Sequence, residues 1–428
     1  MSLRAERRRV GRALRAPFGR LTTRGRAVLA AGITAALCAL ALGQRDLLRV
    51  GVLLAVVPLL TVVVLGRARY RLACTRTLRP ARVEAGQPAK VVLEVANVSG
   101  ARCGLVLAEE HLPYVLGSRP RFVLPGLEPG ERRAISYPVR SDVRGRFTIG
   151  PLTLTLTDPF GMGEHRRAFS VRDELVVTPP VSVLPPVLLS GDWTGSGDTR
   201  PRAVASSGQD DSTTREYRQG DDLRRVHWRS TARRGELMVR REEQPWQSRA
   251  TLLLDRRRTA HVGQGAGSTF EWSVAALASV AVHLTGRGYA VRLADGERTD
   301  TGPTDTTASA VLDALASVDV AGEVELDRAV SSAASSSNGG LVIAVLAHLD
   351  ATDVALLARL NQAGTSCVAL VADGSAGLGP VRAGAHRAAL DLLRATGWDV
   401  VVAEPGETLA STWGRIGSGR ALLTGGAR

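Results

Sequence analysis

The sequence predicts a protein of mixed class, with two N-terminal transmembrane helices, then an immunoglobulin-like β-sandwich, then a C-terminal doubly wound α/β domain. Three patterns support this prediction: two uncharged apolar stretches enclosed by arginines, a region of short strands separated by turn residues, and a region where apolar runs alternate with helical patterns. The 428 residues suffice for about two to four domains. An apolar content of 44% excludes a mainly disordered protein.

The positive charge of the chain is concentrated in two short blocks. The 55 Lys and Arg and 41 Asp and Glu give a net charge of +14, which by itself suggests a polyanionic partner. Residues 1–26 carry nine arginines and one glutamate, and residues 66–82 carry six arginines and no acid. Residues 83–428 hold 38 basic and 39 acidic groups and are close to neutral. This distribution argues against a nucleic-acid partner and indicates a membrane topology signal.

Between the basic blocks lie two uncharged apolar stretches of 17 residues, 27–43 and 50–66. Each would extend roughly 25 Å as a helix, near the minimum that crosses a bilayer. Because arginines flank the pair on both outer sides, the positive-inside rule places both ends in the cytoplasm, with residues 44–49 as a tight turn outside. We therefore predict a multi-pass plasma-membrane protein with a basic cytoplasmic tail at 1–26, a helical hairpin at 27–66, and both termini in the cytoplasm.

Three other interpretations of this region are open. A cleaved signal peptide would use Ala39-Leu40-Ala41 as its cleavage site, but the second apolar stretch would still anchor the chain. A buried hairpin of a soluble protein would not need such dense arginine flanks. A basic tail that binds nucleic acid would not need the apolar pair.

The spacing of cysteine and histidine gives no sign of a metal or disulfide site. Cys38 lies in the first apolar stretch, and Cys74, Cys103 and Cys367 are scattered without a CxxC pair. The seven histidines form no HxxxH or HxH pair. We expect no metal and no cofactor.

Residues 72–178 are predicted to form a small β-sandwich of immunoglobulin-like type. Residues 89–95 and 131–139 are extended segments, and leucines alternate with threonines over 152–157, the period of a half-buried strand. Turn residues separate these segments, and short strands at such spacing are typical of a sandwich. Residues 179–214, rich in Pro, Gly, Ser and Asp, are expected to be a linker.

Residues 250–428 are predicted to form the α/β domain. Its buried parallel strands are expected at 251–254, 289–293, 341–346, 367–371 and 400–402. Its helices are expected at 270–284, 307–318, 351–362 and 381–396. Ligands of such sheets bind beyond the carboxyl ends of the strands. An enzyme with an unrecognised site at this edge, near Asp255 and Asp295, is therefore an alternative function, although no nucleophile–base pair or phosphate loop is recognisable there.

The most informative segment is residues 215–249, with ten arginines and six acidic residues. Acidic residues suited to a helix N-terminus, followed by Gly235 and an extended stretch, predict a strand–turn–helix–strand unit. An interdomain scaffold with a buried Trp228 and a partner-docking face both fit this composition. A nucleic-acid patch is disfavoured by the interleaved acids, and a metal at the Gly-Asp-Asp triplet is disfavoured because helix capping explains the triplet. The residues expected to carry the scaffold or docking role are Arg215, Glu216, Tyr217, Gly220, Asp221, Asp222, Arg224, Trp228 and Arg233.

The stretch REYRQGDDLRRVHWRSTARRGELMVRRE, which begins at Arg215, resembles the signature of the bacterial domain of unknown function 58 family. Four upstream landmarks resemble that family as well: Pro125-Gly126, Arg144-Gly145-Arg146-Phe147, Gly150-Pro151 and Asp158-Pro159-Phe160-Gly161. The resemblance implies a C-terminal domain similar to a von Willebrand factor A domain, and association with a MoxR-type AAA+ ATPase.

In von Willebrand factor A domains, a metal-ion-dependent adhesion site begins with Asp-x-Ser-x-Ser after the first strand. The matching positions here are Asp255, Arg257 and Thr259, so a guanidinium replaces the first ligand hydroxyl and would repel a divalent cation. The resemblance thus implies a degenerate site. We expect a membrane-anchored, non-catalytic scaffold or docking protein whose partners are the lipid bilayer and an AAA+ ATPase or another cytoplasmic or envelope protein.

Overall fold

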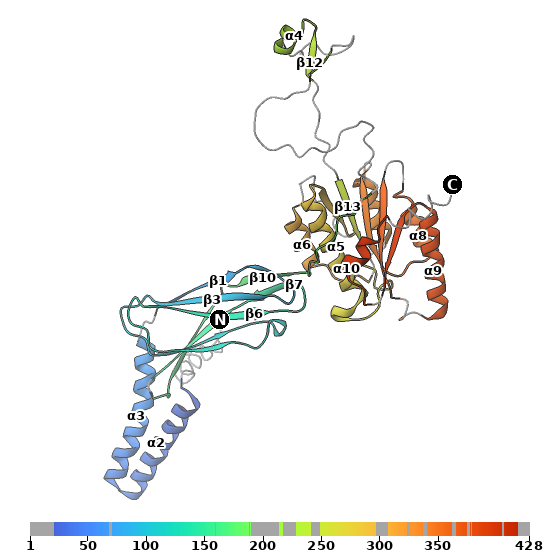
Figure 1. Cartoon of the computed structure of the whole chain (residues 1–428). Helices are drawn as coiled ribbons and strands as arrows, with labels where there is room; N and C mark the ends of the chain where they lie inside the picture. The colour runs from blue at the N-terminus through green and yellow to red at the C-terminus, as the bar shows by residue number, and fades with distance from the viewer. Residues whose placement is uncertain are drawn as a thin grey trace, which may run out of the picture. The chain divides into compact units, whose positions relative to one another are not determined.

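The computed structural model describes two compact units. The described residues are 21–67, 71–158, 160–187, 189, 214–216, 228–240, 249–296, 307–322, 326–336, 340–361, 365–374, 377, 379–404 and 406–417. The first unit consists of the described residues up to Pro180 together with Leu312–Val318, and the second consists of the remainder (Figure 1).

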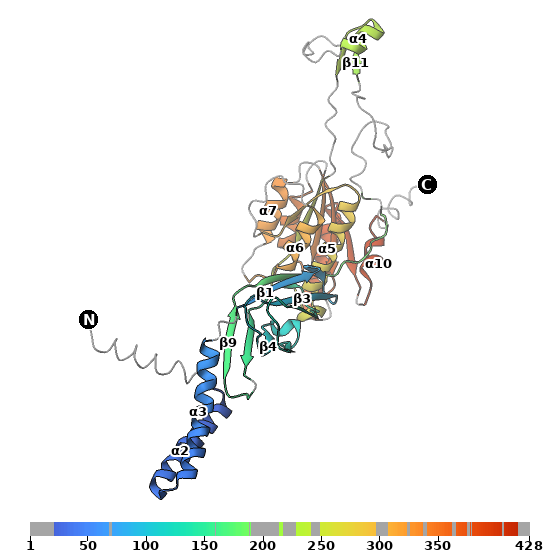
Figure 2. The same ribbon diagram turned by 90° about the vertical axis from the view of Figure 1, so that its left-hand side faces the viewer.

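The first unit begins with a helical hairpin. Helix α2 spans Thr23–Leu42 and α3 spans Arg45–Arg67, and Figures 1 and 2 together show that the two helices lie side by side. Both are long and apolar enough to cross a membrane. The turn is shorter than the predicted 44–49, because the chain reverses at Gly43, which adopts a left-handed φ of +67°, and α3 already begins at Arg45.

Glycines allow the two helices to approach closely. A Cβ on Gly32 would lie 2.6 Å from the backbone N of Ala55, and a Cβ on Gly51 would lie 2.6 Å from the backbone N of Ala36. Side chains larger than hydrogen cannot fit at these two positions unless the helices separate. Small residues at a helix–helix contact are typical of membrane proteins.

The remainder of the first unit is rich in β structure. One antiparallel sheet has the order β1 (Leu72–Arg79), β3 (Pro88–Asn97) and β6 (Arg132–Arg140). A second has the order β5 (Arg121–Leu124), β4 (Leu105–Glu110), β8 (Leu152–Thr157) and β9 (Glu164–Phe169). A third has the order β2 (Arg82–Glu84), β10 (Asp173–Thr178) and β7 (Gly145–Ile149). Alternate residues such as Leu93 of β3 and Leu154 of β8 pack into one common core, so the predicted β domain and its three expected strands are confirmed.

The second unit contains a small element ahead of its main sheet. Strand β11 (Thr214–Glu216) pairs antiparallel with β12 (Met238–Arg240), and helix α4 (Trp228–Arg234) precedes β12. Gly235 follows α4 with a φ of +77° and donates its N–H to the carbonyl of Thr231 at 2.9 Å. The predicted strand–helix–strand order and the helix end at Gly235 are confirmed. We refer to these three elements as the β11–α4–β12 unit.

The main sheet has five parallel strands in the order β14 (Ala290–Ala294), β13 (Arg249–Leu254), β15 (Leu341–Leu346), β16 (Ser366–Ala372) and β17 (Asp399–Ala403). All five predicted strands are confirmed. The predicted helices correspond to α5 (Thr269–Gly286), α6 (Ala308–Ala316), α8 (Ala351–Ala358) and α9 (Pro380–Ala395). Two further helices were not predicted, α7 (Leu326–Ser336) and α10 (Leu409–Gly414).

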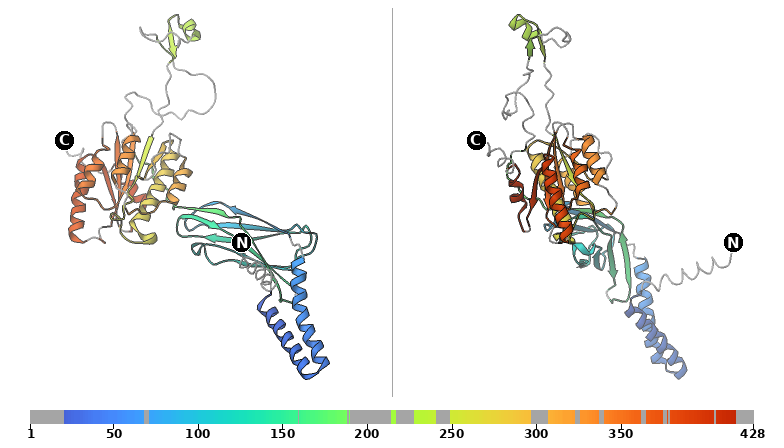
Figure 3. Two further views of the ribbon diagram at one scale, coloured as in Figure 1. Left: turned by 180° about the vertical axis from the view of Figure 1, so that it is seen from behind. Right: turned by 90° about the vertical axis from the view of Figure 1, so that its right-hand side faces the viewer.

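Helices cover both faces of this sheet (Figure 3). Residues of α7, α8 and α9 share one hydrophobic core with the sheet. On the other side, His283 of α5 contacts the ring of Trp413 in α10. The sheet is therefore doubly wound, as predicted. The chain moves from β13 outward to β14 and then returns to β15, so its winding direction reverses between β13 and β15.

Candidate functional site

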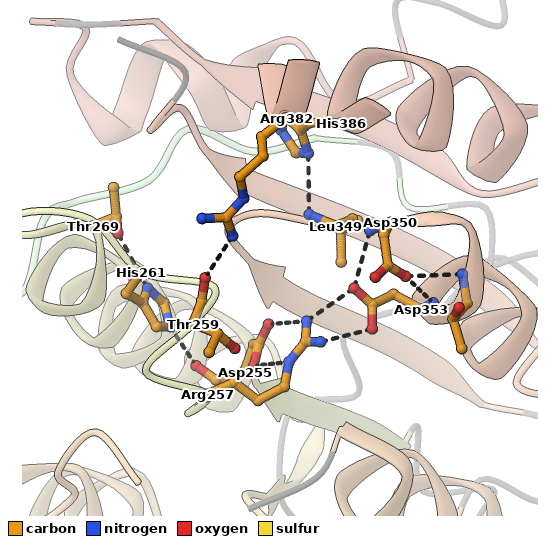
Figure 4. A network of polar contacts seen from close by, with 11 residues as sticks. Asp255, Arg257, Thr259, His261, Thr269, Leu349, Asp350, Asp353, Arg382 and His386 are labelled. Atoms are coloured by element: carbon orange, nitrogen blue, oxygen red, sulfur yellow. Dashed lines mark hydrogen bonds and ion pairs between the residues drawn. The ribbon is translucent and has the colours of Figure 1, made fainter. Parts of the chain in front are cut away.

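The candidate site lies where β13 and β15 end, at the point where the winding direction of the sheet reverses. Ligands of open α/β sheets bind at this place because the loops after the two strands diverge there. The loop after β13 begins with Asp255, and the loop after β15 leads to Asp350, the N-cap of α8. Both loops and their polar contacts are drawn in Figure 4.

The guanidinium of Arg257 fills this position and binds two carboxylates at once. Its Nε and Nη2 donate to the two oxygens of Asp255 at 3.0 and 2.8 Å. Its Nη1 and Nη2 donate to the two oxygens of Asp353 at 2.7 and 3.2 Å (Figure 4). These three residues are called the triad below. Such forked contacts are the strongest type of charged hydrogen bond in proteins.

The local backbone fixes both carboxylates. The Asp255 side chain is fully buried and also accepts the N–H of Arg257 at 3.1 Å. Asp353 belongs to a capping box at the start of α8: it accepts the N–H of Asp350 at 3.0 Å, while Asp350 accepts the N–H groups of Thr352 and Asp353. The triad is therefore held by a strand end on one side and by a helix cap on the other.

The guanidinium of Arg257 keeps its positive charge over the whole physiological range, because its pKa is raised. Burial by itself lowers the pKa of Arg257, but the hydrogen bonds and charges of Asp255 and Asp353 outweigh burial, and the pKa is raised above its already high value. His261, whose Nε2 lies 2.7 Å from the carbonyl oxygen of Asp255, has a pKa lowered mainly by burial. The neutral imidazole thus adds no second cation beside Arg257.

The triad is a closed set of ion pairs in which Arg257 occupies the oxygens of both carboxylates. Both oxygens of Asp255 already accept from Arg257, so this carboxylate is poorly suited to act as a general base. Within the described ranges, no three His, Cys, Asp or Glu residues lie close enough to hold a metal ion. Thr259 contributes its backbone carbonyl, which accepts from Arg382 at 3.3 Å. Asp295, the other carboxylate suggested for an enzymatic site, is buried directly after β14.

A histidine network lies beside the triad. The Nδ1 of His386, in α9, accepts the N–H of Leu349 at 3.1 Å, one residue before the α8 cap. Burial lowers the pKa of His386 below its ordinary value of 6.5. His348 lies 5.3 Å from His386 between ring centroids, and its pKa is also lowered, mainly by burial. These rings support the loop after β15.

The nine residues predicted for a scaffold or docking role are only partly covered by the structure. Arg215 and Glu216 lie in β11, and Trp228 and Arg233 lie in α4. The other five lie outside the described residues: Tyr217, Gly220, Asp221, Asp222 and Arg224. Trp228 is 71% exposed, contrary to the burial that the scaffold interpretation requires, and Arg233 is exposed as well.

Sequence reasoning missed the second carboxylate of the triad. Asp353 follows Asp350 by three residues at the start of an apolar helical pattern, which is the spacing of a capping box. That signal was available in the sequence. The 96-residue separation between Arg257 and Asp353 explains why their contact could not be predicted without the sheet order.

Two landmark residues of the first unit have structural roles. Gly150 has a φ of +104°, and a Cβ there would lie 2.8 Å from the carbonyl oxygen of Val171 and 2.9 Å from Nη2 of Arg76. Only glycine therefore leaves room for Arg76, a buried side chain that pairs with Glu110 at 2.5 Å and with Asp173 at 2.6 Å.

Arg144 is the second of these landmark residues. It is buried, and its Nε donates to the carbonyl of Leu315 at 3.0 Å while Nη2 donates to the carbonyl of Val318. Both acceptors are carbonyls at the end of α6 or just beyond it, where the backbone lacks partners of its own. Arg144 thus caps the C-terminus of that helix.

Comparisons with known proteins give one family and distant structural similarities. No curated protein matches the sequence. The CARDB domain of a Pyrococcus furiosus protein, solved with di-metal ions, is 14% identical, covers 25% of this chain and 93% of its own, and has a TM-score of 0.20. Native alpha-2-macroglobulin from Escherichia coli, from domain MG7 to its C-terminus, is 16% identical with 26% and 17% coverage and a TM-score of 0.23. These similarities carry no argument about function.

The family match covers the most informative part of the chain. Residues 213–373 match the model described as "Protein of unknown function DUF58". This range includes the β11–α4–β12 unit and all three residues of the triad. The resemblance predicted from the sequence is thereby confirmed for residues 213–373, which are similar to the DUF58 family model.

Proposed function

We propose that this chain is a membrane-anchored, non-catalytic docking protein that presents the β11–α4–β12 unit to a MoxR-type AAA+ ATPase during assembly of a complex or of the cell envelope. The observation that carries the proposal is the exposure of Trp228. Tryptophan is usually largely buried, and together with arginine it is enriched at the energetic centres of protein interfaces. The ATPase is proposed because the family resemblance implies it.

The contacts within the triad support a non-catalytic role for the α/β domain. The crevice where a doubly wound sheet would bind a small ligand is occupied by the chain's own guanidinium, which satisfies both neighbouring carboxylates. A von Willebrand factor A-like domain of this kind would bind partners through its surface rather than through a bound cation. Arg257 would replace the metal as the fixed positive charge of the site.

The hairpin supports anchoring in the plasma membrane. Only 22% of each candidate span is buried within the structure, and large apolar side chains of α2 and α3 are exposed along their length. Such a surface is unfavourable in water and suited to lipid. The arginine-rich flanks favour a cytoplasmic location of both termini. A reporter that fluoresces only in the cytoplasm, fused to the C-terminus, should be bright, and a dark fusion would exclude this topology.

Capture of the ATPase tests the docking role. The full chain, purified in detergent and immobilised, should retain the MoxR-type ATPase of the same cell, and Trp228→Ala or Arg233→Glu should reduce the retained amount at least tenfold. Arg394→Glu is the matched control, because Arg394 is an exposed arginine that pairs with the nearby Asp391 on the same helix. Equal retention by all four proteins, with thermal unfolding unchanged, would contradict docking at this unit. Unfolding of the Trp228 and Arg233 variants would instead favour the scaffold interpretation.

A further inference from the structure

The loop between β8 and β9 is bound to the first turn of α2. Thr22, the N-cap of α2, donates its backbone N–H to the carbonyl of Met162 at 3.0 Å and its hydroxyl to the carbonyl of Gly161 at 2.6 Å. Leu21 and Gly163 form an antiparallel bridge. A Cβ on Gly25 would collide with the carbonyl oxygen of Met162. The β domain is therefore attached directly to the start of the candidate membrane helix.

A buried carboxylate fixes the shape of this loop and leaves an aromatic ring exposed. Asp158 is buried and accepts the N–H of Phe160 at 3.0 Å and the N–H of Gly163 at 2.6 Å. The Phe160 side chain nevertheless stays 68% exposed. A large apolar side chain on a loop fixed in this way loses little conformational entropy when it is buried by a partner.

The position of the loop along α2 identifies that partner. The uncharged stretch begins five residues after Thr22, so the N-cap lies roughly 7 to 8 Å outside the hydrocarbon edge if α2 crosses the membrane. The interfacial layer on each side of the hydrocarbon is about 5 to 8 Å thick. Arg24 and Arg26 are exposed in the same turn, and Nη1 of Arg24 lies 3.9 Å from the position of a Cβ on Gly161. Arginines at this depth bind lipid phosphates.

We propose that the β8–β9 loop is a second membrane contact, in which Phe160 inserts among the headgroups of the bilayer and Arg24 and Arg26 bind anionic phospholipid. This inference rests on the proposed insertion of the hairpin and adds that the β domain itself touches the membrane. Exposed aromatic and basic residues are the combination by which peripheral segments bind an interface. The loop would fix the orientation of the β domain relative to the bilayer.

An environment-sensitive fluorophore at position 160 tests the proposal. Phe160→Cys is made in a Cys38→Ser background, because Cys38 is the exposed native cysteine. Cys103 and Cys367 are buried, and burial raises the pKa of Cys74 to about 11, so these thiols react poorly at neutral pH. The labelled full chain is reconstituted into vesicles that contain phosphatidylglycerol and a lipid quencher at headgroup depth.

Tyr114→Cys in the same background is the matched control. Tyr114 is 96% exposed and follows β4. In the β4–β8 ladder, Leu105 pairs with Thr157 beside the loop, while Glu110 pairs with Leu152 at the opposite end. Five residues of strand separate these ends by roughly 17 Å. A label at position 114 therefore lies on the same domain but far from the proposed contact.

We expect blue-shifted emission and at least threefold stronger quenching at position 160 than at position 114. Equal quenching at both positions, in protein that floats with the vesicles, overturns the loop contact and leaves the membrane hairpin intact. Protein that fails to float with the vesicles overturns the hairpin and the loop contact together. If quenching at position 160 is as strong in vesicles of phosphatidylcholine alone as in vesicles with phosphatidylglycerol, the role of Arg24 and Arg26 in binding anionic lipid is overturned. The proposal is supported in full when only vesicles with phosphatidylglycerol give the strong signal.

Discussion

Arg257 forms ion pairs with two carboxylates that are buried away from water. The Asp255 side chain is fully buried, the Asp353 side chain is 9% exposed, and the guanidinium between them is 19% exposed. Desolvation of such charges costs several kcal/mol per ion unless each has a partner. The single arginine therefore stabilises both loop ends at the centre of the sheet.

Substitution of Arg257 should be strongly destabilising. Arg257→Met leaves two buried carboxylates without a positively charged partner and should cost about 3 to 5 kcal/mol, measured as the free energy of unfolding of the α/β unit. Arg257→Lys should recover only part of this loss, because an ammonium cannot bind two carboxylates in forked geometry. Arg394→Ala, at an exposed ion pair, should change the stability by at most about 0.5 kcal/mol. Similar losses for Arg257→Met and Arg394→Ala would contradict the role of the triad.

Stability of the α/β unit should decrease as the pH falls below about 6.5. The pKa values of His261 and His386 are lowered in the folded state, mainly by burial, so the unfolded state takes up protons first. This stability is present above the unfolded pKa and is lost on acidification. Amide hydrogen exchange in β15 and α9 should show less protection at pH 5.5 than at pH 7.5. The comparison is corrected for the pH dependence of the intrinsic exchange rate.

His386→Gln separates this effect from general acid sensitivity. Glutamine retains an acceptor for the N–H of Leu349 but does not titrate, so the loss of protection at pH 5.5 should be smaller than in the wild type. Wild-type protection that is unchanged or stronger at pH 5.5 would show that the buried histidines are not linked to folding.

At the scale of elements, the strands could be predicted more fully than the helices. The central strands of the main sheet are short and mainly apolar, as in β15 with the sequence LVIAVL, because both faces of the sheet are covered. Helix α7 has the sequence LDRAVSSAASS, in which serines mask the helical pattern. It forms because Leu326, Ala329 and Val330 recur on one face and pack against the sheet. Formation of α7 therefore depends on packing contacts that the sequence does not reveal.

The helical hairpin should depend on its close backbone contact. Gly32→Leu places a side chain where Ala55 of α3 already lies, so α2 and α3 should separate and the protein should aggregate at lower temperature in detergent. The monodisperse fraction after heating, followed by size-exclusion chromatography, measures this effect. Ala31→Leu adds the same side chain on the exposed side of α2 and should have little effect. Equal loss in both variants would indicate that the glycine contact is unimportant.

At the scale of the whole molecule, the structure refines the meaning of the net charge. The sequence predicts that the basic block at 66–82 is a topology signal, but Arg76 is buried between Glu110 and Asp173, and Arg82 pairs with Asp313 at 2.6 Å. These partners lie 34 to 231 residues away, so the sequence alone could not show that the two charges are compensated. The overall charge still favours membrane anchoring over a polyanionic partner, because residues 83–428 remain close to neutral.

The candidate site was only partly predictable for the same reason. The position of Arg257 directly after the first strand of the α/β domain could be predicted from the sequence, whereas its contact with Asp353 required the order of the strands. The exposure of Trp228 was also beyond the sequence, since arginine-rich segments with a tryptophan fit both a buried scaffold and an interface. The exposure of Trp228 is the property that distinguishes a buried scaffold from a docking interface.

Photocrosslinking from position 228 in intact cells tests the central claim, which is that a membrane-anchored chain docks its partner through the β11–α4–β12 unit. A photoreactive phenylalanine analogue replaces Trp228, and the same analogue at Val381, an 85% exposed position at the start of α9, is the control. We predict one dominant adduct with a cytoplasmic AAA+ ATPase from position 228 and none from position 381. No ATPase adduct from position 228, or equal adducts from both positions, would contradict it.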